Sequence, residues 1–390
     1  MEKPILAAML SCSSVKLSDA EKRLFEKYNP LGVTLFGRNL VSPAQIQALT
    51  KEIKETVGRD DVLIAVDQEG GRVRRLQGDG FYDIVSMEQL GNIAAKQGIG
   101  KAIAAAIEHS ILTCQDLHKA GFNFNYAPVL DIAYPETTPA LRNRCFGSDE
   151  KLIVLLGGVM AEEYAANGIC PCIKHLPGHG RAQADPHLHL PVITASLKEL
   201  EKDFYPFRQL NQTPAGMTAH VVIEAVDDLP ATQSSKVIRE IIRGIIEFDG
   251  LLISDAIDMK ALSGTAAEKA VGALKAGCDA VCYCSGNAAE MEEVCRSCTN
   301  LADKSLIRFA KIKNIIQTKL NTEVLAEAYY EITGSANMMR RKCCIACNKK
   351  IKGERYVFRF LGMVFSRVDR RGHFRCGKTS RLAQRSGRET

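Results

Sequence analysis

The chain has 390 residues, a formal net charge of +6, 46% hydrophobic and 25% charged residues, and no tryptophan. These proportions are ordinary for a soluble globular protein. No apolar stretch approaches the roughly 20 residues that a membrane span needs, and the first residues, MEKPILAAMLSC, show no signal-peptide cleavage pattern. We therefore expect a soluble, cytoplasmic protein that does not associate with a membrane.

Charge is distributed unevenly along the chain. Residues 340–390 hold 16 Lys and Arg against 3 Asp and Glu, so the remainder carries a net charge of −7. The length exceeds that of a usual single domain, but barrels of alternating strands and helices reach about 250 residues and more as one unit. The sequence therefore predicts one large domain, residues 1–330, and a basic tail, residues 331–390, that is poorly ordered.

Short apolar runs rich in branched residues alternate with helical patterns, which favours strand-helix units and a parallel sheet. The predicted strands are Ile5–Leu10, Gly32–Phe36, Val62–Val66, Phe122–Val129, Ile169–Ile173, Gly216–His220, Leu251–Ser254 and Ala280–Cys284. The predicted helices cover residues 18–28, 43–57, 87–120, 150–167, 197–210, 234–248, 265–276 and 287–320. Eight such units predict a (β/α)8 TIM-type barrel, and an open doubly wound sheet is the alternative.

Polar side chains collect just after the predicted strands, where a barrel places its active site. They are Asp67, Glu69, Asp131, Arg144, Lys174, His175, His220 and Asp255. Each of them taken singly is equally well explained by a salt bridge or a helix cap. Because parallel strands are buried on both faces, several charges gathered at their ends need a ligand or one another. The pattern therefore predicts a ligand site at the barrel mouth.

The stretch from Lys174 to Pro191, KHLPGHGRAQADPHLHLP, holds four of the chain's eight histidines. Groups that titrate near neutrality gather there and core-forming residues are few, which is typical of a site. Asp185 and His187 are two residues apart, so in an extended chain their side chains point to the same side. An imidazole oriented by a carboxylate is the usual construction of a general acid/base that works near neutral pH.

Other interpretations of this stretch remain open. His179 and His189 serve equally well to close hydrogen bonds within the loop. A metal site of His175, His179, His187 and His189 is a further alternative, but the four lack the paired helical spacing that makes zinc motifs specific. We expect no metal and no cofactor. Fourteen cysteines are scattered through apparent strands and helices, and we expect them to be small buried hydrophobes in a reducing compartment.

Four segments resemble the signature segments of family 3 glycoside hydrolases, in order and with barrel spacing over residues 1 to about 325. The segments are VDQEGGRVRR at 66–75, NRCFGSD at 143–149, KHLPGHGRAQADPHLHLP at 174–191 and LLISDAIDMKAL at 251–262. The chain is most similar to the single-domain bacterial β-N-acetylhexosaminidases of peptidoglycan recycling. The resemblance implies a retaining exo-β-N-acetylglucosaminidase that removes terminal N-acetylglucosamine from muropeptides through a covalent glycosyl-enzyme intermediate.

The resemblance also implies roles for individual residues. Asp255 matches the catalytic nucleophile, His187 the acid/base, and Asp185 the group that orients and charges His187. The positions that bind the N-acetylglucosamine unit are matched by Asp67, Arg75, Arg144, Lys174 and His175. Retaining glycosidases need one ionised carboxylate and one group that first gives and then takes a proton. A histidine suits the second role, with Glu69 and Glu224 as the alternative proton donors.

The tail from about Glu331 does not resemble the family. Two residues separate Cys344 from Cys347, and two separate His373 from Cys376, so a zinc ribbon that contacts nucleic acid is one interpretation. A basic extension without a fixed structure is the other. The alternative function is a catalytically idle sugar-binding barrel whose tail binds nucleic acid or a partner. We favour a monomeric enzyme that makes no nucleic-acid contact, because an idle barrel has no need of the matched catalytic residues.

Overall fold

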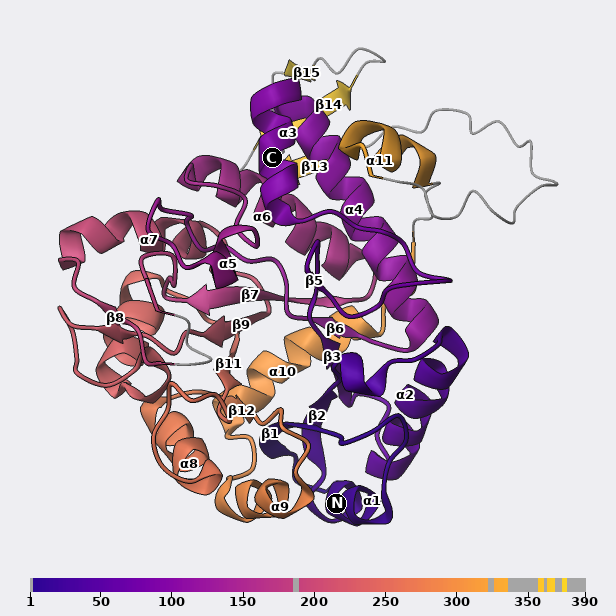
Figure 1. The fold of residues 1–390 in the computed structure, drawn as a ribbon, viewed down its shortest axis with the longest axis vertical. Helices are drawn as coiled ribbons and strands as arrows, with labels where there is room; N and C mark the ends of the chain where they lie inside the picture. Colours follow the sequence, from indigo (N-terminus) through magenta and orange to yellow (C-terminus); the bar gives the residue numbers. More distant parts are fainter. Residues whose placement is uncertain are drawn as a thin grey trace, which may run out of the picture.

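A closed barrel of eight parallel strands forms the centre of the computed structural model (Figure 1). The structure describes residues 3–184, 189–321 and 326–335, and the backbone of three strands at 357–360, 363–368 and 374–376. The barrel strands are β1 (Leu6–Ser11), β2 (Pro30–Thr34), β3 (Leu63–Val66), β6 (Phe124–Asn125), β7 (Cys170–Leu176), β9 (Ala215–Thr218), β11 (Leu251–Ala256) and β12 (Ala280–Cys282). Each pairs with the next in chain order, and β12 pairs with β1. The predicted barrel is confirmed and the open sheet is excluded.

Helices surround this barrel in Figure 1. They are α1 (Asp19–Tyr28), α2 (Pro43–Val57), α3 (Met87–Gln97), α4 (Ile99–Ala120), α5 (Pro139–Arg142), α6 (Glu150–Ala166), α7 (Leu197–Gln209), η3 (Val237–Ile245), α8 (Ala266–Ala276), α9 (Ala288–Ser297), α10 (Asp303–Ile316) and α11 (Ala326–Thr333), with short turns η1 (Gly37–Asn39) and η2 (Ala231–Gln233). Capping residues begin several of these helices. Ser18 accepts a hydrogen bond from the Glu21 amide while Glu21 accepts one from the Ser18 amide, and the same reciprocal capping begins α7 and α8.

Two predicted helices are each divided in the structure. The helix predicted at 87–120 becomes α3 and α4, because Gly98 between them adopts a φ of +94°, which no right-handed helix contains. The helix predicted at 287–320 becomes α9 and α10. There the connecting residues hydrogen-bond to the start of the barrel instead, with Ala7 donating to the Thr299 carbonyl and Leu301 donating to the Ile5 carbonyl. The segment predicted as a helix at 234–248 is shorter and has π-helical hydrogen bonding.

The strands around the histidine-rich stretch differ in length from the prediction. Strand β7 continues to Leu176, so Lys174 and His175 lie within the strand rather than after it. Strand β6 contains only Phe124 and Asn125, and Pro128 follows soon after without an amide hydrogen to donate. The long β7 carries two charged or titratable side chains directly into the barrel mouth.

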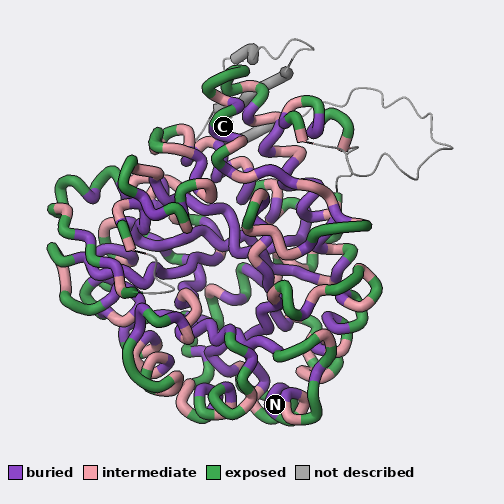
Figure 2. Tube along the Cα trace, viewed as in Figure 1, coloured by how far each residue is buried: buried purple, intermediate pink, exposed green. Residues whose placement is uncertain are grey.

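Two apolar clusters hold these layers together. One fills the barrel interior, with Met9, Leu63, Phe124 and Ile253 among its members, and the other lies between the strands and the helices. Figure 2 shows the buried segments running through the centre of the molecule, with exposed backbone at its rim. Of the ten described cysteines, all are unpaired and nine are buried, as expected for small core residues.

Shorter elements complete the description. Strands β4 (Gln68–Gly70) and β5 (Val73–Arg74) form a hairpin after β3, and β8 (Val192–Ile193) pairs with β10 (Val222–Ile223). In the tail, β13 (Val357–Phe360), β14 (Met363–Val368) and β15 (Phe374–Cys376) form an antiparallel sheet. The side chains proposed to bind zinc there lie outside the described residues. None of the helices in the described ranges is long and apolar enough to cross a membrane.

Helix α11 packs against α3 and α4 and spans the domain boundary predicted at residue 330. The Tyr329 side chain is fully buried and its hydroxyl accepts a hydrogen bond of 2.8 Å from the Val85 amide. The Tyr330 hydroxyl accepts one of 3.2 Å from the Asp83 amide. The Val85 carbonyl oxygen in turn packs against Gly70 of β4, where a Cβ atom would lie only 2.0 Å from it. Through Tyr329 and Val85, α11 therefore supports the β4–β5 hairpin.

We predict that two truncations on either side of α11 behave differently. A chain ending after Ser335 should keep the melting temperature of the full chain, because it keeps both tyrosines. A chain ending after Asn321 should melt at least about 5 °C lower, since losing a buried aromatic side chain costs about 3–5 kcal/mol. Thermal unfolding followed by circular dichroism measures both, and equal melting temperatures for the two truncated chains would contradict the role given to α11.

Candidate active site

A cavity of about 410 Å³ opens among the carboxyl ends of the barrel strands. Six of the eight residues predicted for the site line it: Asp67, Arg75, Arg144, Lys174, His175 and Asp255. Tyr126, His179, Cys282 and Cys284 are also part of its wall. The structure thus brings together predicted site residues that are up to 188 positions apart in the sequence. Their roles in binding and catalysis stay predictions.

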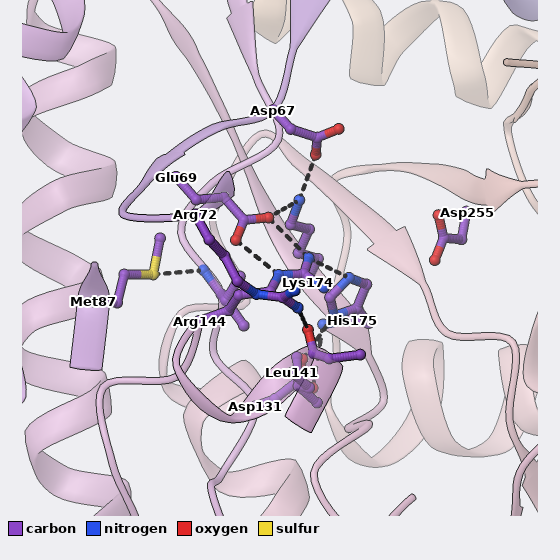
Figure 3. A network of polar contacts seen from close by, with 12 residues as sticks. Asp67, Glu69, Arg72, Met87, Asp131, Leu141, Arg144, Lys174, His175 and Asp255 are labelled. Atoms are coloured by element: carbon purple, nitrogen blue, oxygen red, sulfur yellow. Dashed lines mark hydrogen bonds and ion pairs between the residues drawn. The ribbon is translucent and has the colours of Figure 1, made fainter. Parts of the chain in front are cut away.

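A buried network of ion pairs forms one wall of the cavity (Figure 3). The Glu69 side chain is 1% exposed, and its two oxygens accept hydrogen bonds from Arg144 Nε and Nη2, both at 2.8 Å. Lys174 Nζ lies 2.6 Å from Glu69 Oε1 and 2.7 Å from Asp67 Oδ1. Arg75 Nη2 lies 3.9 Å from Asp67 Oδ2. Glu69 therefore holds two cations at once, and Lys174 connects it to Asp67.

The network fixes the charge of its members. Burial alone would raise the pKa of the Glu69 carboxyl group, but the charges of Arg144 and Lys174 hold that pKa well below its usual range. Burial alone would lower the pKa values of Lys174 and Arg144, and the facing carboxylates raise both above their usual values. All three groups are therefore charged at neutral pH. Glu69 lacks the proton that a general acid must donate, so it is not the alternative proton donor.

His175 occupies the next position along the same wall. Its Nδ1 atom lies 2.7 Å from Asp131 Oδ2, and its Nε2 atom lies 3.3 Å from Arg144 Nη2. Because arginine can only donate, Nε2 must accept, which assigns the ring proton to Nδ1. The other Asp131 oxygen accepts the backbone amides of His175 and His179. Burial would raise the pKa of Asp131, but His175 and His179 lower it, so a carboxylate fixes the orientation of His175.

Asp255 lies within β11 and apart from this network in Figure 3. Its Oδ1 atom accepts the Ala256 amide at 2.7 Å. Burial would raise its pKa, but the imidazoles of His220 and His175, the Ala256 amide and Lys174 together lower it below the usual value. Burial lowers the pKa of His220 itself, and the charge of Asp255 opposes that effect. Asp255 is therefore an ionised carboxylate at the cavity wall.

Asp185 and His187 lie outside the described residues, so the structure does not place the predicted acid/base pair. The chain that leads to them is firmly held. A Cβ atom on Gly180 would lie 1.9 Å from the Ile132 carbonyl oxygen, so only glycine fits there. Arg181 Nε donates to Asp203 Oδ2 at 2.8 Å. The polypeptide is therefore held in place at Gly180 and Arg181, directly after the cavity-lining His179.

The metal interpretation gains no support from the described residues. No group of three or more His, Cys, Asp or Glu side chains within residues 3–184, 189–321 and 326–335 is arranged to hold a metal ion. His175 is engaged with Asp131, and His187 lies outside the described part. For His179, no hydrogen-bond partner of either ring nitrogen occurs among the described residues, and burial lowers its pKa to about 4. The described residues therefore lend no support to the alternative in which His179 closes a loop hydrogen bond through its ring.

Sequence reasoning placed Glu69 and Asp131 at the barrel mouth and named Glu69 as an alternative proton donor, but it did not predict the partners that the two carboxylates have in the structure. The structure makes Glu69 the acceptor that holds Arg144 and Lys174, and makes Asp131 the acceptor that orients His175. The available signal was charge balance: several cations predicted at one buried mouth require carboxylates beside them.

A closed parallel barrel with charged side chains at the carboxyl ends of its strands has the architecture of a barrel enzyme. Residues 6–317 match the family described as the glycosyl hydrolase family 3 N terminal domain. The chain is 39% identical over 297 residues to a beta-hexosaminidase of Hydrogenovibrio crunogenus, covering 73% of this chain and 82% of that protein. A beta-hexosaminidase of Bordetella avium is 35% identical over 282 residues, covering 71% and 80%.

Solved structures agree with these relatives. The crystal structure of NagZ from Neisseria gonorrhoeae in complex with N-trifluoroacetyl-D-glucosamine aligns with a TM-score of 0.76 and 31% identity, covering 85% of this chain and 98% of that one. A family 3 β-N-acetylglucosaminidase from Paenibacillus aligns with a TM-score of 0.73 and 28% identity, covering 84% and 66%. The chain belongs to family 3 of the glycoside hydrolases. It is a glycoside hydrolase.

We predict that Glu69→Gln strongly destabilises the protein, because it leaves Arg144 and Lys174 buried with one carboxylate fewer. Removing one partner of a buried ion pair costs about 3–5 kcal/mol. The matched control is Glu292→Gln, which breaks the exposed pair with Arg296 and should cost less than about 1 kcal/mol. Urea denaturation measures both, and equal losses for the two variants would contradict the structural role of Glu69.

The role of Glu69 also predicts how the free energy of unfolding depends on pH. The folded pKa of Glu69 lies below its unfolded value of about 4.3. The stabilisation from Glu69 is therefore fully present above that unfolded value and is lost as the pH falls toward the folded pKa. Unfolding free energy should decline less in Glu69→Gln than in the unaltered protein as the pH is lowered from about 5 to 3.

Proposed function

We propose that this glycoside hydrolase is a retaining exo-β-N-acetylglucosaminidase that removes terminal β-linked N-acetylglucosamine from peptidoglycan fragments. One observation supports the proposal most: the carboxylate of Asp255 and the sugar-binding candidates line a single cavity at the barrel mouth. Its volume is toward the lower end of the roughly 300–1,000 Å³ of small-molecule pockets, which suits one terminal sugar unit. The beta-hexosaminidase relatives, and a NagZ that binds an N-acylated glucosamine, agree with it.

The proposed sugar contacts follow from unused hydrogen-bonding capacity. The Lys174 ammonium group has three donors, of which Asp67 and Glu69 take two. Asp67 is 19% exposed, so its carboxylate is within reach of sugar hydroxyl groups. Arg144 uses Nε and Nη2 on Glu69, which leaves Nη1 for a ligand oxygen. Held in this way, the three groups bind hydroxyl or acetamido oxygens without rearranging, and that lowers the ordering cost of binding.

The proposed chemistry uses Asp255 and the His187–Asp185 pair. Asp255 is ionised because its surroundings lower its pKa, and a carboxylate is the form that attacks the anomeric carbon. His187, oriented and charged by Asp185, protonates the leaving oxygen and then takes a proton from the attacking water. A histidine is suited to both steps because its ordinary pKa is about 6.5. The network of Glu69 supplies no proton, and we assign the protonation to His187.

The alternative function is a catalytically idle barrel that binds sugar while the tail contacts a partner. The ionised Asp255 inside the cavity favours the enzyme, because it supplies the carboxylate that attack on an anomeric carbon requires. We also propose that the glycosidase unit lies within residues 1–330 together with the rest of α11, since every matched site residue precedes that helix.

We predict that His187→Ala slows poor leaving groups far more than good ones. Natural disaccharides need protonation of the departing oxygen, whereas 4-nitrophenyl glycosides need little, so the loss should differ by about 10²–10⁴-fold between them. Asp185→Ala should show the same pattern more mildly. His189→Ala, which removes an exposed histidine of the same segment, is the matched control and should have little effect.

The readout is kcat/KM for N,N′-diacetylchitobiose and for 4-nitrophenyl N-acetyl-β-glucosaminide. An equal loss on both substrates would mean that His187 only positions the sugar or the loop. Glu224, the remaining alternative proton donor, would then be tested next.

A further inference from the structure

Two cysteines of the cavity wall are close enough for both sulfur atoms to bond to one atom placed between them. Cys282 ends β12 and Cys284 follows two residues later, and their sulfur atoms are 3.3 Å apart. Both side chains line the cavity. Two sulfurs bonded at about 2.3 Å to one central atom lie roughly 3.3–3.8 Å apart, for bond angles from about 92° to 110°. The pair is therefore already spaced for a soft centre that takes two sulfurs at once.

The backbone on each side of the pair is held in place. The Cys282 amide donates to Ser254 Oγ at 2.9 Å, and the Cys284 amide donates to Asp258 Oδ1 at 2.8 Å. The Cys284 carbonyl accepts a hydrogen bond of 2.6 Å from Arg38 Nη2. Because these bonds fix the backbone at both ends of the tripeptide, little backbone ordering is needed when a ligand binds both sulfur atoms.

The other neighbouring cysteines of the described part lack this combination. Cys170 and Cys172 are both fully buried within the barrel and do not line the cavity. Cys295 and Cys298 lie at the end of α9, also outside the cavity wall. Cys282 and Cys284 alone among the described cysteines combine a close pair of thiols with access to the space where we propose the sugar binds.

We propose that Cys282 and Cys284 form a dithiol site for soft, thiophilic centres, represented by trivalent arsenic, inside the glycosidase cavity. Soft sulfur ligands select soft metals and metalloids. In the reaction with an arsenoxide, R–As=O, two S–H bonds and the As=O bond break and two As–S bonds form. The two protons and the oxygen leave as water, so no oxidant or reductant is needed. The bridged group then occupies the cavity and excludes the sugar.

Phenylarsine oxide is the probe, and intact-protein mass spectrometry is the first readout. The full-length protein should gain one phenylarsine group and lose two hydrogens at one equivalent of reagent, and 2,3-dimercaptopropanol should remove the adduct. Cys282→Ala and Cys284→Ala should each lose this chelated adduct. The double variant Cys295→Ala/Cys298→Ala removes two thiols outside the cavity and should keep it.

The second readout is turnover of 4-nitrophenyl N-acetyl-β-glucosaminide, and it rests on the proposed function. Stoichiometric reagent should abolish most turnover of the unaltered protein and of the Cys295→Ala/Cys298→Ala control, and dimercaptopropanol should restore it. The mass measurement does not depend on activity, so the two ideas can fail separately. Absence of the adduct, or an adduct that persists in both single variants, would overturn the dithiol site.

Discussion

The charge of Glu69 is the constraint on which the rest of the barrel mouth depends. A carboxylate with 1% exposure is costly to bury alone, and so are the cations of Arg144 and Lys174 that face it. Brought together, they satisfy one another and leave donors directed into the cavity. Since Lys174 is part of β7, Arg144 follows the fourth barrel strand and Glu69 belongs to the hairpin after β3, the network also joins three separate segments.

The wall built on this network leaves a chemical asymmetry in the cavity. On one side the charged groups are neutralised by direct contacts and are suited to binding. Asp255 lies apart from them in Figure 3. Burial would raise its pKa, but His220, His175, the Ala256 amide and Lys174 lower it, and no ion pair joins it directly to a cation among the described residues. A carboxylate that is ionised but not tied to a cation is free to act as a nucleophile. We propose that this separation of the charged network from Asp255 divides sugar binding from nucleophilic attack.

The fold was largely predictable from sequence, because the barrel strands are short apolar runs that alternate with helical patterns. The ends of helices at Gly98 and at residues 298–302 were not predictable from sequence. The positive φ of Gly98 and the hydrogen bonds between residues 299–301 and the start of the barrel both depend on tertiary contacts. Six site residues could be named from motifs, but Glu69 and Asp131 gained their roles only through three-dimensional pairing. The spacing of Cys282 and Cys284 likewise depends on how the end of β12 is held.

The central claim is that the barrel mouth hydrolyses N-acetylglucosaminides with Asp255 as nucleophile. Its most direct test is the turnover of 4-nitrophenyl N-acetyl-β-glucosaminide by the unaltered protein and by Asp255→Asn, which keeps the shape of the side chain but removes its charge. The account predicts hydrolysis by the former, and a loss of roughly 10³-fold or more in a variant that melts at the same temperature. Near-normal turnover by folded Asp255→Asn would contradict it.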